Sequence, residues 1–578
     1  MAESGSTVSP ENGDRGGAGP VIRPTSMPLR RRRPAWHAVA GFAMVLPALV
    51  FLVTSYLEPT IWAVRSSLRT VDVLRGGLVG PGGNASTGGA NYRLMLDNGF
   101  GRSLGFALSL AVVPLIVVTV LAPLLAWSAN RAGTRARRTS RALLALPLAC
   151  FAPVAVAVGW RIERVARYDA VPGATGLVRE VTWLASLGLV CALAVTWYLA
   201  ALRRIDAYRR PGPAMAAAGL LACLAVVAAA LQTFSYPYVL VGGGGDTDPP
   251  LLVMLSTSLV RGEFGPAAAV ATVLLAILAV LGVIATIVVL VTGMRLEVDR
   301  EAPATAATSA GPSSPRARWP WAAILTGLLV AAVLGVSLYA MIPWLRHAAS
   351  SGGLAAPLTG TRVLVNTWVP PLVSTGVGVA AAALAGFGIG ALRPLGRASE
   401  LLLLPFAPYL FVGIGPLALR AYAAGATADR LDSLIGLVPP TRLEVPALFL
   451  FTLLFRGQAM RAEQQRQRGA GPAGWWRGLL RPALPMIGLV ALASWVVRAQ
   501  DLLWPVLSGS GPHATGPVVL AGQLRAVDGS PGDPAYALVM PPLVLLVLIA
   551  IAVLAQVTYL DRVALRVGRP EYPGGPRT

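Results

Sequence analysis

The sequence lacks lysine altogether and contains only three cysteines, three histidines and few charged residues. Without lysine, no Gly-x-x-x-x-Gly-Lys-Ser/Thr phosphate-binding loop can form, so any ATP that drives this protein must be bound and hydrolysed by another chain. The cysteines stand far apart in apolar runs, where we expect them to pack as small core residues. Because the histidines are isolated as well, the sequence predicts neither a metal site nor a bound cofactor.

Long apolar runs make up much of the remaining sequence. Hydrophobic residues account for 55% of the chain and charged residues for 13%, a balance that excludes a water-soluble globule. About twenty apolar residues in a helix cross the hydrocarbon core of a bilayer, which is about 30 Å thick. We therefore predict an all-α, polytopic membrane protein with about twelve transmembrane helices. The candidate spans are residues 37–57, 104–128, 141–160, 182–202, 214–236, 267–292, 319–344, 368–392, 400–422, 434–456, 483–505 and 538–559.

Arginine supplies every basic side chain except histidine and gives the chain a net charge of +22. In a soluble protein this charge would suggest nucleic-acid binding, but here the arginines gather in short loops between apolar runs, so we expect no nucleic-acid partner. Loops rich in arginine mark the cytosolic side of a membrane protein. The clearest such loops contain Arg131, Arg135, Arg137, Arg138 and Arg141; Arg203, Arg204, Arg209 and Arg210; and Arg461, Arg466, Arg468, Arg477 and Arg481.

The chain divides into two similar halves around a polar, proline- and alanine-rich linker. Six spans return the chain to the side on which it began, so the halves share one orientation and form two parallel six-helix repeats. The expected parts are a disordered cytosolic tail at 1–34, a first half at 35–295, the cytosolic linker at 296–318, a second half at 319–568 and a cytosolic tail at 569–578.

The most informative cytosolic loop lies between the tenth and eleventh candidate spans. Glu463 is followed six residues later by Gly469 and thirteen residues after that by Pro482, with Pro472 between them. This spacing resembles the EAA loop of ABC importer permeases, although two glutamines replace the alanine pair. The resemblance implies a short helix that docks into a groove of a cytosolic ATPase and couples ATP hydrolysis to the pore. An ordinary arginine-rich loop explains these residues, taken alone, about equally well.

Segments on either side of this loop resemble the same family in the expected order. The stretch from Ser494 to Pro505 is similar to the Ser-Trp-Asn-Asp-Phe-Leu-Trp-Pro segment of carbohydrate-importer permeases, and Asn366-Thr367 opens a similar span. The chain resembles a fusion of the two permease subunits of a type I, binding-protein-dependent ABC sugar importer, like those for maltose or glycerol phosphate, over about residues 35–568. The first half matches the partner subunit at Leu46-Pro47-Ala48, Glu58-Pro59, Asn91-Tyr92 and Tyr238 to Gly244.

The corresponding cytosolic loop of the first half departs from the family pattern. Residues 200–213 are much shorter than a coupling loop and lack its glutamate and its glycine. Asp206 is the only acidic residue of this segment, which makes it the candidate for a contact with an ATPase. Either this half docks to the ATPase differently, or one of the two expected contacts is missing.

Polar and aromatic residues within the spans are candidates for lining a translocation pathway. A charged side chain at membrane depth is costly and should face a cavity or a partner. Arg498 and Asp501 lie three residues apart, so on one helix they would share a face and pair, either as a structural ion pair or, with Gln500, as a polar lining. Aromatic rings stack on sugars and amides bind their hydroxyls, although such residues also serve in packing and at membrane interfaces. The candidates of this kind are Trp160, Gln232, Phe234, Tyr236, Trp368, Tyr409 and Trp495.

The family resemblance implies a permease for a small solute, with a carbohydrate as the expected class. An extracytoplasmic solute-binding protein would deliver the solute, and a cytosolic ABC ATPase dimer would drive alternating access. The chain would be a multi-pass protein of the bacterial plasma membrane with both termini in the cytosol. It would itself catalyse no covalent reaction and is not expected to be an enzyme.

Two other functions remain open at the level of sequence. A secondary transporter would need an ion-coupling carboxylate deep in the bundle, and Asp501 is the only candidate that the predicted spans suggest. A polytopic glycosyltransferase could use the pair Asp246 and Asp248 in an Asp-x-Asp arrangement, but the loops outside the membrane are short for such an enzyme.

Overall fold

The structure is a computed structural model that describes residues 35–69, 86–167, 174–203, 211–242, 248–298, 320–354, 358–467, 478–524 and 534–568. Helices dominate these residues, and the named strands among them are two segments of four residues each. We refer to residues 35–298 as the N-terminal region and to residues 320–568 as the C-terminal region.

The N-terminal region runs from helix α1 to strand β1. Its elements are α1 (Ala35–Leu52), η1 (Val53–Leu57), α2 (Glu58–Ser67), α4 (Ala90–Asp97), α5 (Phe100–Leu110), α6 (Val112–Ile116), η2 (Val117–Leu121), α7 (Ala122–Ala132), α8 (Thr134–Ala149), α9 (Pro153–Arg167), α10 (Ala174–Leu202), α11 (Gly212–Leu231), α12 (Ser235–Val241), α13 (Pro250–Leu255), η3 (Ser256–Val260), α14 (Phe264–Thr292) and β1 (Arg295–Val298).

The C-terminal region runs from helix α15 to strand β2. Its elements are α15 (Pro320–Leu345), α16 (Gly360–Phe387), η4 (Gly388–Leu392), η5 (Gly396–Tyr409), η6 (Gly415–Leu417), α17 (Ala418–Thr427), α18 (Val445–Gln467), α20 (Leu484–Ala499), α21 (Leu503–Ser508), η7 (Gly511–His513), α22 (Gly516–Gln523), α23 (Tyr536–Val539), α24 (Pro542–Leu554), η8 (Ala555–Tyr559), η9 (Leu560–Arg562) and β2 (Val563–Arg566).

Within the described residues, eight helices are long and apolar enough to cross a membrane. A ninth span is possible if the bent pair Thr134–Ala149 and Pro153–Arg164, which meets at 75°, counts as one crossing. The prediction of a helical, membrane-embedded protein is confirmed at this level. The eight helices are Trp36–Ser67, Phe100–Ala132, Thr175–Leu202, Gly212–Val241, Phe264–Thr292, Pro320–Leu345, Gly360–Leu392 and Pro542–Arg562.

Four candidate spans take a different form from the one predicted. The span over 141–160 is broken just before Pro153, between α8 and α9, which meet at 75°. The expected continuous helix over 400–422 is wrong, because the chain there forms the 3₁₀ helix η5, the turn η6 and the short helix α17. Prolines inside this stretch remove backbone donors and break a regular α-helix. The helix expected over 434–456 begins only at Val445, and the one expected over 483–505 ends at Ala499 after 16 residues.

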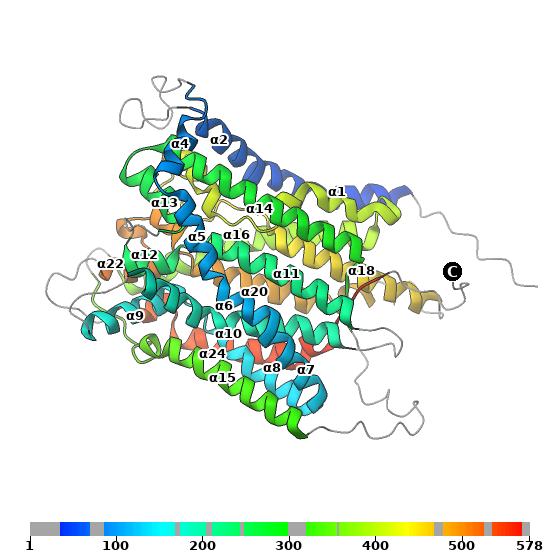
Figure 1. Cartoon of the computed structure of the whole chain (residues 1–578). Coiled ribbons are helices and arrows are strands. Elements are labelled where there is room, and N and C mark those ends of the chain that lie inside the picture. The colour runs from blue at the N-terminus through cyan, green and yellow to red at the C-terminus, as the bar shows by residue number, and fades with distance from the viewer. Residues whose placement is uncertain are drawn as a thin grey trace, which may run out of the picture.

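The first helix of each region packs on the other region. Helix α1 packs on α16 and η4 of the C-terminal region, and α15 packs on α7 and α10 of the N-terminal region. Figure 1 shows α1 and α15 on opposite sides of the bundle. Gly41 and Gly188 allow the close approach, because a Cβ at Gly41 would press on Pro394 and one at Gly188 would overlap the Ser337 hydroxyl. Each region therefore completes the packing of the other.

The last long helix of each region also contacts the other region. Helix α14 contacts η5, and α24 contacts α8. The strand that follows each helix then joins the other strand in an antiparallel ribbon with the register Arg295 to Arg566 through Val298 to Val563. We call the end of the bundle that contains β1 and β2 the ribbon end; α12 and α22 lie at the opposite end (Figure 1). The ribbon end also holds Arg137, Arg138 and Arg141 of α8, which contact Asp561 just before β2.

Candidate functional site

A buried ion pair lies where α18 begins, and it forms the centre of the candidate pathway. Arg498 near the end of α20 contacts the carboxylate of Glu444 at 2.7 Å. The same guanidinium donates to the Thr441 carbonyl at 3.0 Å and to the Ser374 hydroxyl of α16. The side chains of Arg498 and Glu444 are only 13% and 17% exposed, so the charges compensate each other away from bulk water.

The chain just before α18 is irregular, and side chains from three helices bind its backbone. Pro439 and Pro440 prevent this segment from joining the helix. The Ser374 hydroxyl lies 3.1 Å from both the Pro439 and Thr441 carbonyl oxygens, and Tyr56 of the N-terminal region donates to the Leu443 carbonyl at 2.8 Å. Irregular backbone at membrane depth needs such partners or a water-filled cavity. The segment is therefore held where both regions meet.

The structure corrects the predicted pairing of Arg498 with Asp501. Helix α20 ends at Ala499, so the three-residue spacing of these side chains no longer places them on one helical face. Asp501 instead accepts hydrogen bonds from the backbone amides of Leu503 at 3.3 Å and Trp504 at 3.2 Å. It therefore caps the short helix α21, and Arg498 is neutralised by Glu444.

Two of the predicted aromatic residues meet beside this ion pair. The rings of Trp368 and Trp495 lie 5.3 Å apart in an edge-to-face arrangement, and the Trp495 indole donates to the Trp368 carbonyl at 2.8 Å. Gln500 is buried and donates to the Val539 carbonyl at 3.0 Å. In the described part of the chain, the Trp368 indole nitrogen and the Gln500 amide oxygen are buried without a hydrogen-bond partner. Such groups can bind the hydroxyls of a polar solute.

The other pathway candidates make structural contacts apart from the ion pair and the two indoles. Gln232 joins the two regions, because its amide donates to the Phe411 carbonyl at 2.8 Å and accepts from the Gly413 amide at 2.7 Å. Trp160 likewise donates to the Ala340 carbonyl at 2.8 Å. Phe234 and Tyr236 pack in or against the apolar core. The Tyr409 ring lies 5.4 Å from the ring of Tyr56, so this candidate borders the segment before α18.

The predicted coupling residues lie at the ribbon end as far as the structure describes them. Glu463 is solvent-exposed near the end of α18. Pro482 is buried, and its carbonyl accepts a hydrogen bond from Tyr559 at 2.7 Å. Gly469, Pro472 and Asp206 lie outside the described residues. So does Asp246, whereas its predicted partner Asp248 is described and buried.

Sequence reasoning missed Glu444, Ser374 and Tyr56. Glu444 stands in the middle of the span predicted at 434–456, so the statement that Asp501 was the only acidic candidate within a span was wrong. The signal was present as two charges, Arg442 and Glu444, inside an apolar stretch. Ser374 and Tyr56 gave no such signal, because their partners are backbone carbonyls that only the fold brings near.

The cluster combines a compensated ion pair, two indoles and buried amide groups, which are groups of the kind that bind polar solutes. Among the described residues, no group of histidine, cysteine, aspartate or glutamate side chains could hold a metal ion. Neither the models of known protein families nor the curated proteins compared with this chain match it. The functional assignment therefore rests on the residues themselves.

Proposed function

We propose that the chain is the permease of an ABC importer, with both transmembrane subunits fused into one polypeptide. The observation that carries the proposal is the polar end of α18. This helix extends to Gln467 at the arginine-rich ribbon end, and Glu463 to Arg466 are all exposed there. The loop that resembles the EAA segment follows directly, where a cytosolic ATPase dimer could bind it. ATP would be bound by that partner and not by this chain.

The reciprocal packing supports an arrangement of two parallel repeats with about twelve transmembrane segments. Eight helices and the bent pair of α8 and α9 correspond to nine of the twelve candidate spans. The stretch from η5 to α17, together with α18 and α20, would supply the remaining three. In this scheme α1 and α15 are equivalent, as are α14 and α24, and each pair makes equivalent cross-contacts. Such a repeat suits alternating access around a site between the halves.

The ribbon end would face the cytosol of a bacterium, because arginine-rich connections mark that side. A solute-binding protein would dock at the opposite end and deliver a small solute, with a carbohydrate as the preferred class. The cluster around Arg498 and Glu444, with Trp368, Trp495 and Gln500, would line the path. Closure of the ATPases would act through the loop from Glu463 to Pro482 and change access to this cluster.

The coupling role is tested by Gly469→Asp, which places a bulky charge at the glycine of the loop. We expect ATPase association and ATP-driven uptake to be lost while the amount of protein in the membrane is unchanged. Gly474→Asp, five residues further along the same loop and outside the family pattern, is the matched control and should retain association. Equal ATPase binding by the two variants would count decisively against the proposal.

Glu444 favours one other candidate function, a transporter driven by an ion gradient. A buried carboxylate between helices is the feature that such a transporter requires. Arg498, however, already compensates its charge at 2.7 Å. Purified protein in vesicles with an imposed proton or sodium gradient decides the matter, because solute accumulation without an ATPase would replace the importer by this second function.

A further inference from the structure

The β-ribbon is fastened to α18 by close packing and by hydrogen bonds. Gly457 of α18 lies directly under β1, since a Cβ at this position would overlap the Leu296 carbonyl oxygen. Arg461, one turn further along α18, donates to the Val298 carbonyl, and Arg456 donates to the Met294 carbonyl at 3.3 Å. Strand β1 therefore cannot slide along α18 without breaking these contacts.

Glu297 is the ionic centre of this attachment. Its carboxylate lies 3.0 Å from Arg295 of β1, 3.3 Å from Arg461 of α18 and 3.5 Å from Arg566 of β2. The Glu297 side chain is only 12% exposed. One carboxylate thus joins both strands of the ribbon to the helix that leads into the proposed coupling loop.

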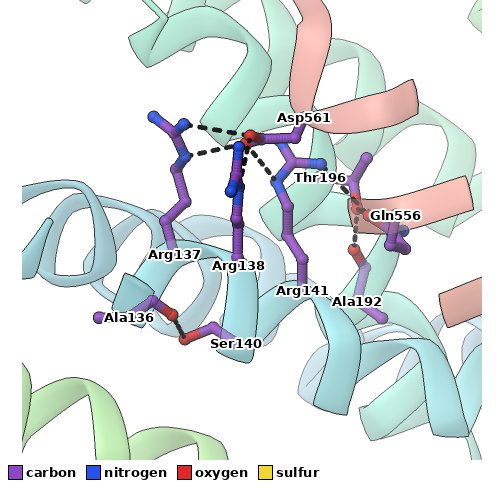
Figure 2. A network of polar contacts seen from close by, with 9 residues as sticks. All are labelled: Ala136, Arg137, Arg138, Ser140, Arg141, Ala192, Thr196, Gln556 and Asp561. Atoms are coloured by element: carbon purple, nitrogen blue, oxygen red, sulfur yellow. Dashed lines mark hydrogen bonds and ion pairs between the residues drawn. The ribbon is translucent and has the colours of Figure 1, made fainter. Parts of the chain in front are cut away.

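The other side of the ribbon is anchored to the N-terminal region. Figure 2 shows Asp561, two residues before β2, surrounded by three arginines of α8. Its carboxylate lies 2.9 Å from Arg137, 3.5 Å from Arg138 and 3.8 Å from Arg141. The Asp561 side chain is 5% exposed, so this anchor is buried.

Helix α10 is tied to the same anchor. Arg141 donates to the side-chain amide oxygen of Gln556 at 3.2 Å, and the Gln556 amide nitrogen in turn donates to the Thr196 hydroxyl of α10 at 3.0 Å. Strand β2 also packs on α10 directly. Helix α10 ends at Leu202, just before the short segment that lacks the coupling glutamate and glycine. The ribbon therefore spans from α18, which leads into the proposed coupling loop, to α8 and α10 of the N-terminal region.

We propose that the β1–β2 ribbon is a crossbar that moves α8 and α10 together with α18, and that Glu297 and Asp561 are the positioning residues that hold it at its two sides. This inference rests on the proposed function for its purpose. A displacement applied to α18 would reach the N-terminal region through two ionic anchors and a hydrogen-bonded ribbon. Transport would then depend less on an ATPase contact in the N-terminal region, because α8 and α10 would move together with α18.

The test measures the distance between α8 and α18 directly and needs no ATPase. Spin labels are placed on Thr139 of α8 and Gln465 of α18, both exposed, in the full chain with its three cysteines replaced by alanine. We expect a narrow distance distribution for this background and a broader one, extended to longer distances, for Glu297→Gln. The control is Glu58→Gln, which removes an ion pair between the two regions, to Arg420 at 2.7 Å, at the opposite end of the bundle. It should leave the distribution narrow.

A folding defect is separated from loss of the crossbar by a second variant. The double variant Glu297→Gln with Arg461→Gln also removes one of the arginine charges, so less uncompensated charge is left buried than in Glu297→Gln alone. We expect its unfolding temperature to be higher than that of Glu297→Gln. The distance distribution between the two labels should be as broad as in the single variant. Unchanged distributions in both variants would overturn the crossbar and leave the importer proposal standing. Failure of the importer would appear instead as unaltered ATPase association in Gly469→Asp.

Discussion

The two ends of the molecule join the same two regions by different means. At the ribbon end, single buried carboxylates each bind several arginines, as Asp561 and Glu297 do, and the strands add backbone hydrogen bonds. Towards the opposite end, the regions meet through neutral hydrogen bonds with backbone groups, made by Tyr56, Gln232 and Trp160. The ion pairs between the regions there are more exposed: the side chains of Glu58 and Arg420 are 48% and 32% exposed, and those of Glu163 and Arg346 are 26% and 65% exposed.

This difference in contacts determines at which end the N- and C-terminal regions separate more readily. A neutral hydrogen bond contributes about 1 kcal/mol to the free energy of unfolding, and an exposed ion pair contributes about 0 to 1 kcal/mol. Both values are small because water can replace either interaction. Breaking a buried ion pair by removing one partner costs about 3 to 5 kcal/mol, because the remaining charge stays without compensation. The ribbon end should therefore move as one body, whereas contacts towards the opposite end can exchange during a transport cycle.

The largest predicted effect concerns Asp561 at the ribbon end. Asp561→Ala would leave three arginines facing one another, of which Arg141 is only 2% exposed. We expect a loss of about 3 to 5 kcal/mol in the free energy of unfolding. Arg138→Ala is the matched control, because Arg138 is 52% exposed and its loss should cost less than about 1 kcal/mol. Unfolding in mixed detergent micelles measures both, and equal losses would remove the basis for the contrast between the two ends.

A smaller effect is expected from Gly457→Ala, which tests the close contact between α18 and β1. The added Cβ would overlap the Leu296 carbonyl oxygen, so the ribbon must shift at a cost of about 1 to 3 kcal/mol. Gly335→Ala in α15 serves as the control, because nothing lies within 4 Å of its Cβ position. There the gain in helix propensity should stabilise the protein by about 0.5 to 1 kcal/mol. A shift of the same sign in both variants would show that the ribbon does not press on α18.

The apolar spans could be predicted from the sequence because hydropathy is a local property. Eight of the twelve candidate spans coincide with helices of membrane-crossing length. The errors at 400–422 and 434–456 lie where prolines interrupt apolar stretches, whereas the span at 483–505 ends early at Ala499 without one. Pro405 and Pro408 fall inside the predicted span at 400–422, and Pro439 and Pro440 fall inside the next one. Because proline disfavours the helix interior, Pro439 and Pro440 predict that α18 begins after them.

The contacts between the two regions could not be predicted in this way. Pairing arguments from helical spacing consider only neighbours three or four residues apart, which is why Asp501 was chosen as the partner of Arg498. Glu444 lies in the segment just before α18 and is brought near Arg498 only by tertiary packing. The ribbon is harder to predict. Each strand has only four residues, and nothing in the two short segments indicates that they pair with each other.

The smallest predicted effect is that of Tyr56→Phe, which removes one hydrogen bond between the regions and almost no volume. The Tyr56 hydroxyl donates to the Leu443 carbonyl at 2.8 Å, so its loss should cost about 1 kcal/mol. Hydrogen exchange should become faster at the backbone amides that follow in the first turn of α18, while the amides of β1 and β2 keep their protection. Tyr92→Phe is the control, because its hydroxyl bonds Ser67 within the N-terminal region. Faster exchange in the ribbon as well would mean that the two ends are not independent, since a loosened contact near α18 would then release the crossbar too.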